Sequence, residues 1–253
     1  MIHSQTRSWT KITASAMAAV ALLAALTVGA RPARADDAQD ARQLVDKARL
    51  TFEGFLADPQ MGPGLRSIVQ RAKGVLIYPQ VLRAAFIFGA AGSSGVFLAR
   101  SGESDAWAGP AFYSFGQASF GLQAGADAAE MVLVALTQRG VSALLSPSAK
   151  LGANASIAVG PLGAGAEAAT ANLSADIVSY SRNKGLYAGL SLEGAYVGPR
   201  NGLNHAYYGK EVTPTQILIL REVSNPQAAE LIAEVARVAG GASTATGPAT
   251  TPE

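Results

Sequence analysis

A change of hydrophobic period at Gly74 constrains the fold of this chain more than any other sequence feature. Before Gly74, apolar residues recur at helical spacing; after it, short runs rich in β-branched and aromatic residues alternate with Gly, Ser, Pro and Asp clusters. Such runs predict antiparallel strands joined by tight turns. The predicted strands are Val75–Tyr78, Ala84–Phe88, Gly95–Arg100, Ala111–Gly116, Ser119–Ala126 and Met131–Leu136, followed by a second strand-rich half from Leu151 to Val197.

Helices are predicted on both sides of the strand-rich region, because apolar residues there recur every three or four positions. They run over Asp36–Leu56, from Met61 to Ala72, over Gln138–Leu145, and over Pro226–Ala239 with Asn225 as N-cap. The predicted fold class is therefore α+β, a Gly-rich antiparallel sheet flanked by N- and C-terminal helices. The pattern leaves open whether the sheet closes toward a barrel.

The first 35 residues have the pattern of a secretory signal peptide. Arg7 and Lys11 precede an apolar run that ends at Val28, and Ala33-Arg34-Ala35 supplies an A-x-A cleavage site. We therefore expect residues 1–35 to be removed, residues 36–239 to form one domain, and residues 240–253 to be a disordered tail. The mature protein is expected to be exported, periplasmic or extracellular, and peripherally attached to a membrane.

Charge and cysteine content narrow the possible functions. The chain has 20 basic and 18 acidic residues and no cysteine. Residues 1–35 hold four of the basic and none of the acidic residues, so the mature chain has a net charge of −2. This charge does not support general attraction to nucleic acid. The lack of cysteine excludes disulfides and thiolate ligands, and we expect neither a metal site nor a cofactor.

Catalytic motifs are weak. His205 is the one histidine of the expected mature chain, and no G-x-S-x-G motif accompanies it. The S-x-x-K string from Ser181 to Lys184 lacks the S-D-N and K-T-G motifs that accompany it in penicillin-binding enzymes. Asp127 and Glu167, in two similar GA[DE]AA strings, are the carboxylates to check as a pocket pair. The sequence therefore predicts a protein that is not an enzyme.

The string SYSRNKGLYAGLSLEG joins a basic, hydroxyl-rich segment to a run in which small residues alternate with leucines. An outer-membrane barrel is one interpretation, but its lipid-facing positions would carry aliphatic side chains where this chain has Gly, Ala and Ser. The preferred interpretation is a compact sheet whose small-residue face is approached by a helix or an acyl chain.

Five ordered blocks resemble the SYLF-domain family. They are AKGVLIYPQVLRAAFIFGA, GPAFYSFGQASFGLQAGAD, MVLVALTQRGVSALLS, LGANASIAVGPLGAGAEAA and YSRNKGLYAGLSLEGAYV, and the resemblance runs from about Leu44 to Leu220. The family includes bacterial secreted proteins and eukaryotic proteins of membrane trafficking and cortical actin. The resemblance implies that this chain is a bacterial secreted member that binds anionic phospholipid and has no catalytic activity. It also implies actin binding in fungal relatives.

The resemblance also implies a basic lipid-binding surface. The matching positions are Arg66, Arg71, Lys73, Arg182 and Lys184, with Tyr180 and Tyr187 beside the last two. Each cation near an anionic bilayer contributes about 1 kcal/mol, and tyrosine rings suit a membrane interface. Acidic residues in the first helix argue against that helix as the lipid contact. The expected partner is an anionic phospholipid surface, and the alternative is a protein partner that the domain binds or bundles.

Overall fold

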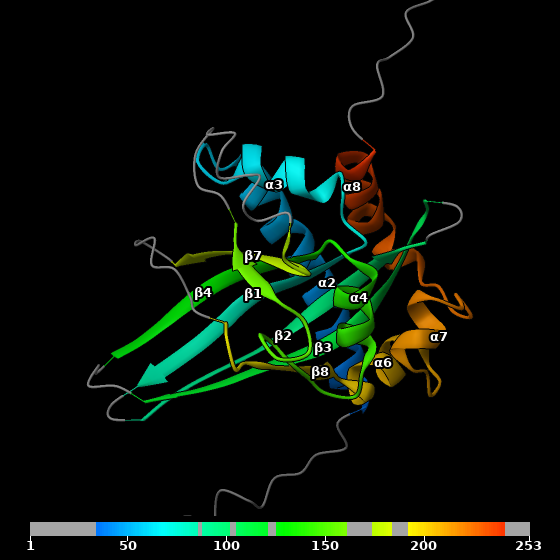
Figure 1. Ribbon diagram of the computed structural model, residues 1–253. Helices are drawn as coiled ribbons and strands as arrows, with labels where there is room; N and C mark the ends of the chain where they lie inside the picture. The colour runs from blue at the N-terminus through cyan, green and yellow to red at the C-terminus, as the bar shows by residue number, and fades with distance from the viewer. Residues whose placement is uncertain are drawn as a thin grey trace, which may run out of the picture. The chain divides into compact units, whose positions relative to one another are not determined.

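The computed structural model describes residues 34–85, 88–101, 105–120, 125–160, 174–183 and 192–240. The chain divides into two compact units, residues 1–36 and 37–253, and the second unit contains the sheet and its helices (Figure 1). Residues 1–33 of the predicted signal peptide, residues 241–253 of the predicted tail, Lys184, Tyr187 and Glu167 lie outside the described residues.

One curled, half-barrel sheet of eight strands forms the centre of the second unit (Figure 1). Its order is β5-β8-β3-β2-β1-β4-β7-β6, and all neighbours are antiparallel except β6 and β7. The strands are β1 (Gly74–Ala85), β2 (Phe88–Arg100), β3 (Trp107–Phe120), β4 (Gly125–Ala135), β5 (Ala149–Lys150), β6 (Ile157–Val159), β7 (Ile177–Asn183) and β8 (Tyr196–Pro199). The predicted α+β class with an antiparallel sheet is confirmed.

Helices cover the sheet on two sides because the strands bury residues on both faces. Val75 and Ile77 of β1 belong to the core that includes buried residues of α2, α3 and α8, whereas Leu76 and Tyr78 belong to a second core that includes residues of α4 and α7. This alternation follows from the two-residue period of a strand. The helices are α2 (Arg34–Ala57), α3 (Gly62–Val69), α4 (Gln138–Leu145), α6 (Asn201–Tyr208), α7 (Pro214–Leu218) and α8 (Ala229–Ala239).

The four long strands differ from the short ones predicted. β1 continues through Pro79 and Gln80, where its register with β2 and β4 shifts. The predicted strands Ala84–Phe88 and Ser119–Ala126 instead straddle strand ends. A Cβ at Gly95 would lie 2.5 Å from the carbonyl oxygen of Ile77. Gly95 therefore permits close packing inside β2.

The four predicted helices are confirmed, with the last one split into a short 3-10 turn, Pro226–Ala228, and α8. Helices α6 and α7 were not predicted. Their signals are present, because Thr213 and Gln216 form a capping box and Gly209 ends α6 in the left-handed conformation. Within the described residues, no helix is both long enough and apolar enough to cross a membrane.

Candidate functional site

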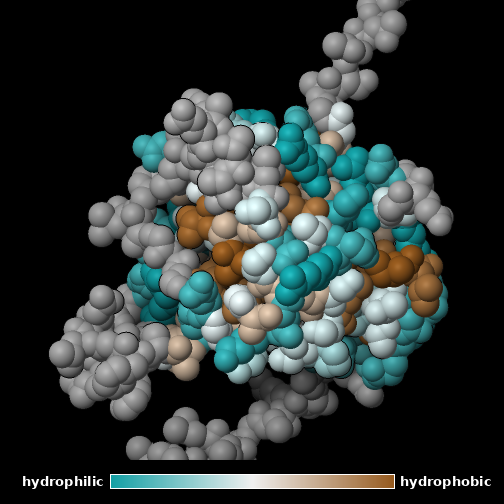
Figure 2. All heavy atoms as spheres, in the orientation of Figure 1, coloured by the Kyte–Doolittle hydropathy of each residue, from teal (hydrophilic) through white to brown (hydrophobic). Residues whose placement is uncertain are grey.

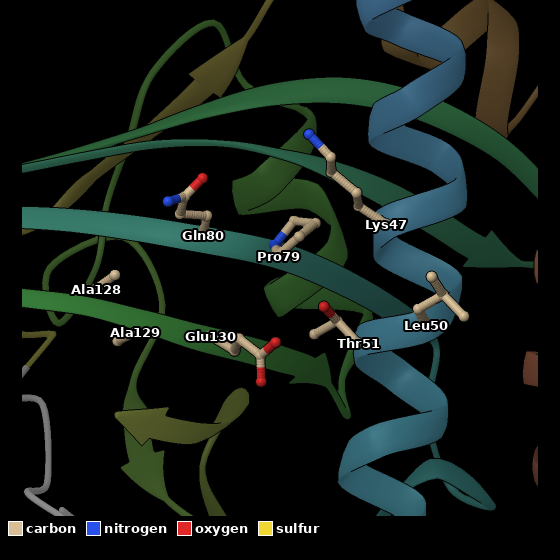
Figure 3. Close-up of a pocket in the computed structure, with 8 residues that line it drawn as sticks. All are labelled: Lys47, Leu50, Thr51, Pro79, Gln80, Ala128, Ala129 and Glu130. Carbon is tan, nitrogen blue, oxygen red and sulfur yellow. The ribbon is translucent and has the colours of Figure 1, made fainter. Parts of the chain in front are cut away.

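A groove separates α2 from the middle of the sheet, and we call it the α2 groove. Two adjoining cavities of about 290 and 360 Å³ form it, and both are lined by Lys47, Pro79 and Gln80. Lys47 and Thr51 reach from α2 toward the strands, while Gln80 and Glu130 lie on the opposite wall (Figure 3). The volumes are at the small end of the range for ligand pockets, about 300–1,000 Å³.

The β1 bulge creates this groove. Tyr78 and Val81 both belong to the core on the far side of the sheet, so the two residues between them have no place in the regular alternation. Pro79 suits this position because it has no N–H to donate to a neighbouring strand. The bulge holds Pro79 and Gln80 out of register below α2. In a regular strand, we would expect a side chain at this position to fill the space that the groove occupies.

Several polar groups that line the α2 groove already have partners in the protein. The Ser93 hydroxyl donates to the backbone oxygen of Gln80 at 2.6 Å, and the Arg200 guanidinium donates to Ser94. Glu130 accepts from Arg182. The rim, in contrast, is apolar and open, because Leu50 and Leu82 are each 57% exposed. The groove therefore offers apolar surface more than free hydrogen-bonding groups.

Arg182 ties the sheet to the C-terminal end of α2. Its Nε lies 2.9 Å from Glu130 Oε2, its Nη1 lies 3.2 Å from the backbone oxygen of Gly54, and its guanidinium lies 4.9 Å from the centre of the Phe55 ring. A Cβ at Gly54 would lie 2.9 Å from Nη2, so the glycine allows this approach. The structure thus gives Arg182 a packing role, and its predicted lipid contact stays a prediction.

Tyr180 is buried, with 2% of its surface exposed. Burial raises the pKa of its phenol, and its hydroxyl has no hydrogen-bond partner among the described residues. A Cβ at Gly160 would lie 2.4 Å from the Tyr180 ring, so that glycine makes room for the ring. The predicted role of Tyr180 at a membrane interface remains a prediction, as do those of Lys184 and Tyr187, which lie outside the described residues.

Arg66, Arg71 and Lys73 are exposed cations within eight consecutive positions at and after the end of α3, and we call them the α3 basic cluster. Arg66 Nη2 donates to the backbone oxygen of Leu56 at 2.7 Å, which fixes its position. Within the part of the chain that the structure describes, no carboxylate forms an ion pair with these three residues. The cluster therefore presents uncompensated positive charge.

The catalytic candidates are not assembled into a site in the described part of the chain. His205 lies in α6, where its Nδ1 is 2.9 Å from the exposed Glu211. Asp127 is paired with Arg83 on the neighbouring strand, with 2.7 Å between Nε and Oδ1. Ser181 lies within β7, not at the start of a helix. Among the described residues, no group of His, Asp and Glu has a metal-binding arrangement.

Residues 116–238 match the family model described as Ysc84, "Las17-binding protein actin regulator". This match supports the assignment of the chain to the Ysc84/SYLF family. The matched region begins in β3 and extends to the end of α8, so the Ysc84-like region includes β4, β7 and the C-terminal helices. Just under half of the chain is matched by this model, and the α2 groove and the α3 basic cluster draw most of their residues from outside it.

Curated relatives extend the similarity to about two thirds of the chain. LAS seventeen-binding protein 3 of Saccharomyces cerevisiae is 34% identical over 168 residues, which are 65% of this chain and 36% of the yeast protein. SH3 domain-containing YSC84-like protein 1 of Bos taurus is 31% identical over 170 residues, which are 66% of this chain and 49% of the bovine protein. The chain thus spans between about a third and half of these relatives.

Proposed function

We propose that this protein is a non-catalytic module that binds anionic phospholipid surfaces through the α3 basic cluster. The observation that supports the proposal is the grouping of Arg66, Arg71 and Lys73 as exposed cations without described carboxylate partners. Three such cations near an anionic bilayer contribute on the order of 3 kcal/mol, which is enough for reversible attachment. A local cluster is needed because the expected mature chain has a net charge of −2.

The proposal includes export through the N-terminal segment and peripheral attachment at the envelope of a bacterial cell. Arg7, Lys11 and the A-x-A string support export, because they are the parts of a secretory signal. N-terminal sequencing of the protein purified from its native host is the check. A mature chain that begins near Asp36 is expected, and an intact Met1 would contradict export.

Vesicle co-sedimentation tests lipid binding. We expect the protein to sediment with vesicles that contain anionic phospholipid, to remain in solution with purely zwitterionic vesicles, and to detach as salt is raised. Exposed charges are screened at a distance of about 8 Å at physiological ionic strength, which is the reason for the salt effect. Equal binding to both kinds of vesicle, or binding that salt does not weaken, would contradict a basic surface as the attachment site.

The second candidate is a protein-interaction module, which the names of the relatives favour. One observation on this chain supports it: Ile219 and Leu220, which follow α7, are 45% and 59% exposed. Figure 2 shows hydrophobic residues gathered at the side of the molecule where α7 lies. Replacing both with Ser should weaken capture of a protein partner while leaving vesicle binding unchanged, so a pull-down in parallel with sedimentation separates the two functions.

A further inference from the structure

Lys47 is the charged residue of the α2 groove that lacks a counter-ion. It lines both cavities, and no described carboxylate lies within 4 Å of its ammonium group. The other charge in the groove, Glu130, is neutralised by Arg182 at 2.9 Å. The groove therefore has a net positive charge at one place, where the two cavities meet, and a single anionic group would complement it.

Gln80 adds a hydrogen-bond donor on the wall that faces Lys47. Its side-chain amide has no partner among the described residues, and Figure 3 shows it on the sheet side while Lys47 extends from α2. A carboxylate has two acceptor oxygens and accepts hydrogen bonds from an ammonium and an amide together. A phosphate, with its greater charge, is typically bound by several cations or backbone amides, which this groove does not offer among its described residues.

The half of the groove beside Leu50 is otherwise lined by apolar residues. Leu50, Pro79, Ala128 and Ala129 line the cavity of about 290 Å³ beside Lys47. An extended peptide would be a poor occupant because each residue carries an N–H and a C=O that need partners. The hydroxyls of Ser93 and Ser94 are already engaged, so these partners are scarce. An alkyl chain has no such requirement.

The groove is about 10 Å long, because the residues of α2 that line it, Leu44 to Thr51, are seven positions apart at 1.5 Å each. It thus accommodates part of an alkyl chain and leaves the rest exposed between the two rim leucines. We infer that the α2 groove binds a single monomeric fatty acid, with its carboxylate between Lys47 and Gln80 and its chain along Ala128. This site is separate from the α3 basic cluster and goes beyond attachment to a membrane surface.

Calorimetric titration of the purified protein with octanoate, decanoate and dodecanoate, each below its critical micelle concentration, tests the inference. Each added methylene that enters the groove should tighten binding by up to about fourfold, and the gain should level off when the chain extends past the groove. Lys47→Glu should weaken dodecanoate binding by about tenfold or more, because the anion then meets a negative charge. Ala128→Phe should block the chain and leave the fold intact.

Lys210→Glu is the matched control, since Lys210 is exposed and does not line the groove. Circular dichroism of each variant verifies folding. Affinity that does not change with chain length, or that survives both Lys47→Glu and Ala128→Phe, would overturn the inference, as would absence of dodecanoate binding by the unaltered protein. Charge reversal of Arg66, Arg71 and Lys73 should leave dodecanoate binding unchanged. Loss of membrane attachment and loss of fatty-acid binding can therefore be distinguished.

Discussion

Asp176 connects three elements through a small polar network. The Thr137 hydroxyl, which also caps α4, lies 2.6 Å from Oδ1, and the backbone N–H and hydroxyl of Ser156 lie 3.0 and 2.9 Å from Oδ2. These hydrogen bonds, that of Thr137 first, lower the pKa of Asp176 below its ordinary 3.8. The ionised carboxylate is therefore stabilised by the native fold.

The sign of the resulting pH dependence follows from this lowered pKa. A carboxyl group whose folded pKa is below its unfolded value stabilises the fold above about pH 4, and that stabilisation is lost as the pH falls through the folded pKa. Asp176→Asn should lower the free energy of unfolding at pH 7 by about 2 kcal/mol and flatten its fall below pH 4. Urea unfolding at several pH values measures both. An unchanged acid limb in the variant would contradict the assignment.

Arg182 should matter to stability more than to the surface charge. Arg182→Met leaves Glu130 and the backbone oxygen of Gly54 without their donor, and we expect a loss of about 1–3 kcal/mol in urea unfolding. Arg237→Met is the comparison, because its ion pair with Glu234 is on the surface of α8 and should matter little. Equal effects of the two substitutions would show that Arg182 does not hold α2 to the sheet.

At the scale of elements, the glycines inside strands separate packing from turn formation. A Cβ at Gly95 would also lie 2.5 Å from Cδ1 of Tyr78, whereas nothing lies within 4 Å of one at Gly116. Gly95→Ala should therefore destabilise the protein by about 1–3 kcal/mol through overpacking. Gly116→Ala, in the next strand, should cost little or nothing. Thermal unfolding of both variants measures this difference in stability, and similar melting temperatures would contradict the packing role of Gly95.

The elements whose signals are local were predictable from the sequence. The ends of α4, between Thr137 and Ser146, follow from a hydroxyl cap and a Ser-Pro stop. The length of β1 was not predictable, because Pro79 and Gln80 are accommodated by a bulge that depends on both neighbouring strands. Tertiary packing thus decided where glycine and proline end a strand and where they do not.

The same distinction applies to the candidate sites. Exposure of Arg66, Arg71 and Lys73 after a short amphipathic helix was anticipated, because α3 buries its apolar residues and leaves the others outside. The α2 groove was not anticipated, since it joins α2 to three strands that are separated along the chain. Burial of Tyr180 was also not anticipated, because its cover, Gly160, comes from another strand region.

At the scale of the whole molecule, the proposal depends on the position of charge and not on its total. The expected mature chain has a net charge of −2, so attraction to an anionic bilayer must arise where cations are grouped. Two variants with the same net charge distinguish the possibilities. One reverses Arg66, Arg71 and Lys73 to Glu; the other reverses Arg42, Lys150 and Lys210, which are exposed elsewhere.

The decisive measurement is the affinity of these two triple variants and the unaltered protein for vesicles that contain anionic phospholipid, at one low salt concentration. We predict that reversal of the α3 basic cluster weakens binding by at least about 100-fold, at about 1 kcal/mol for each cation removed. The charge-matched control should bind much closer to the unaltered protein. Equal weakening in both variants, or none in either, would contradict the α3 basic cluster as the membrane-binding surface.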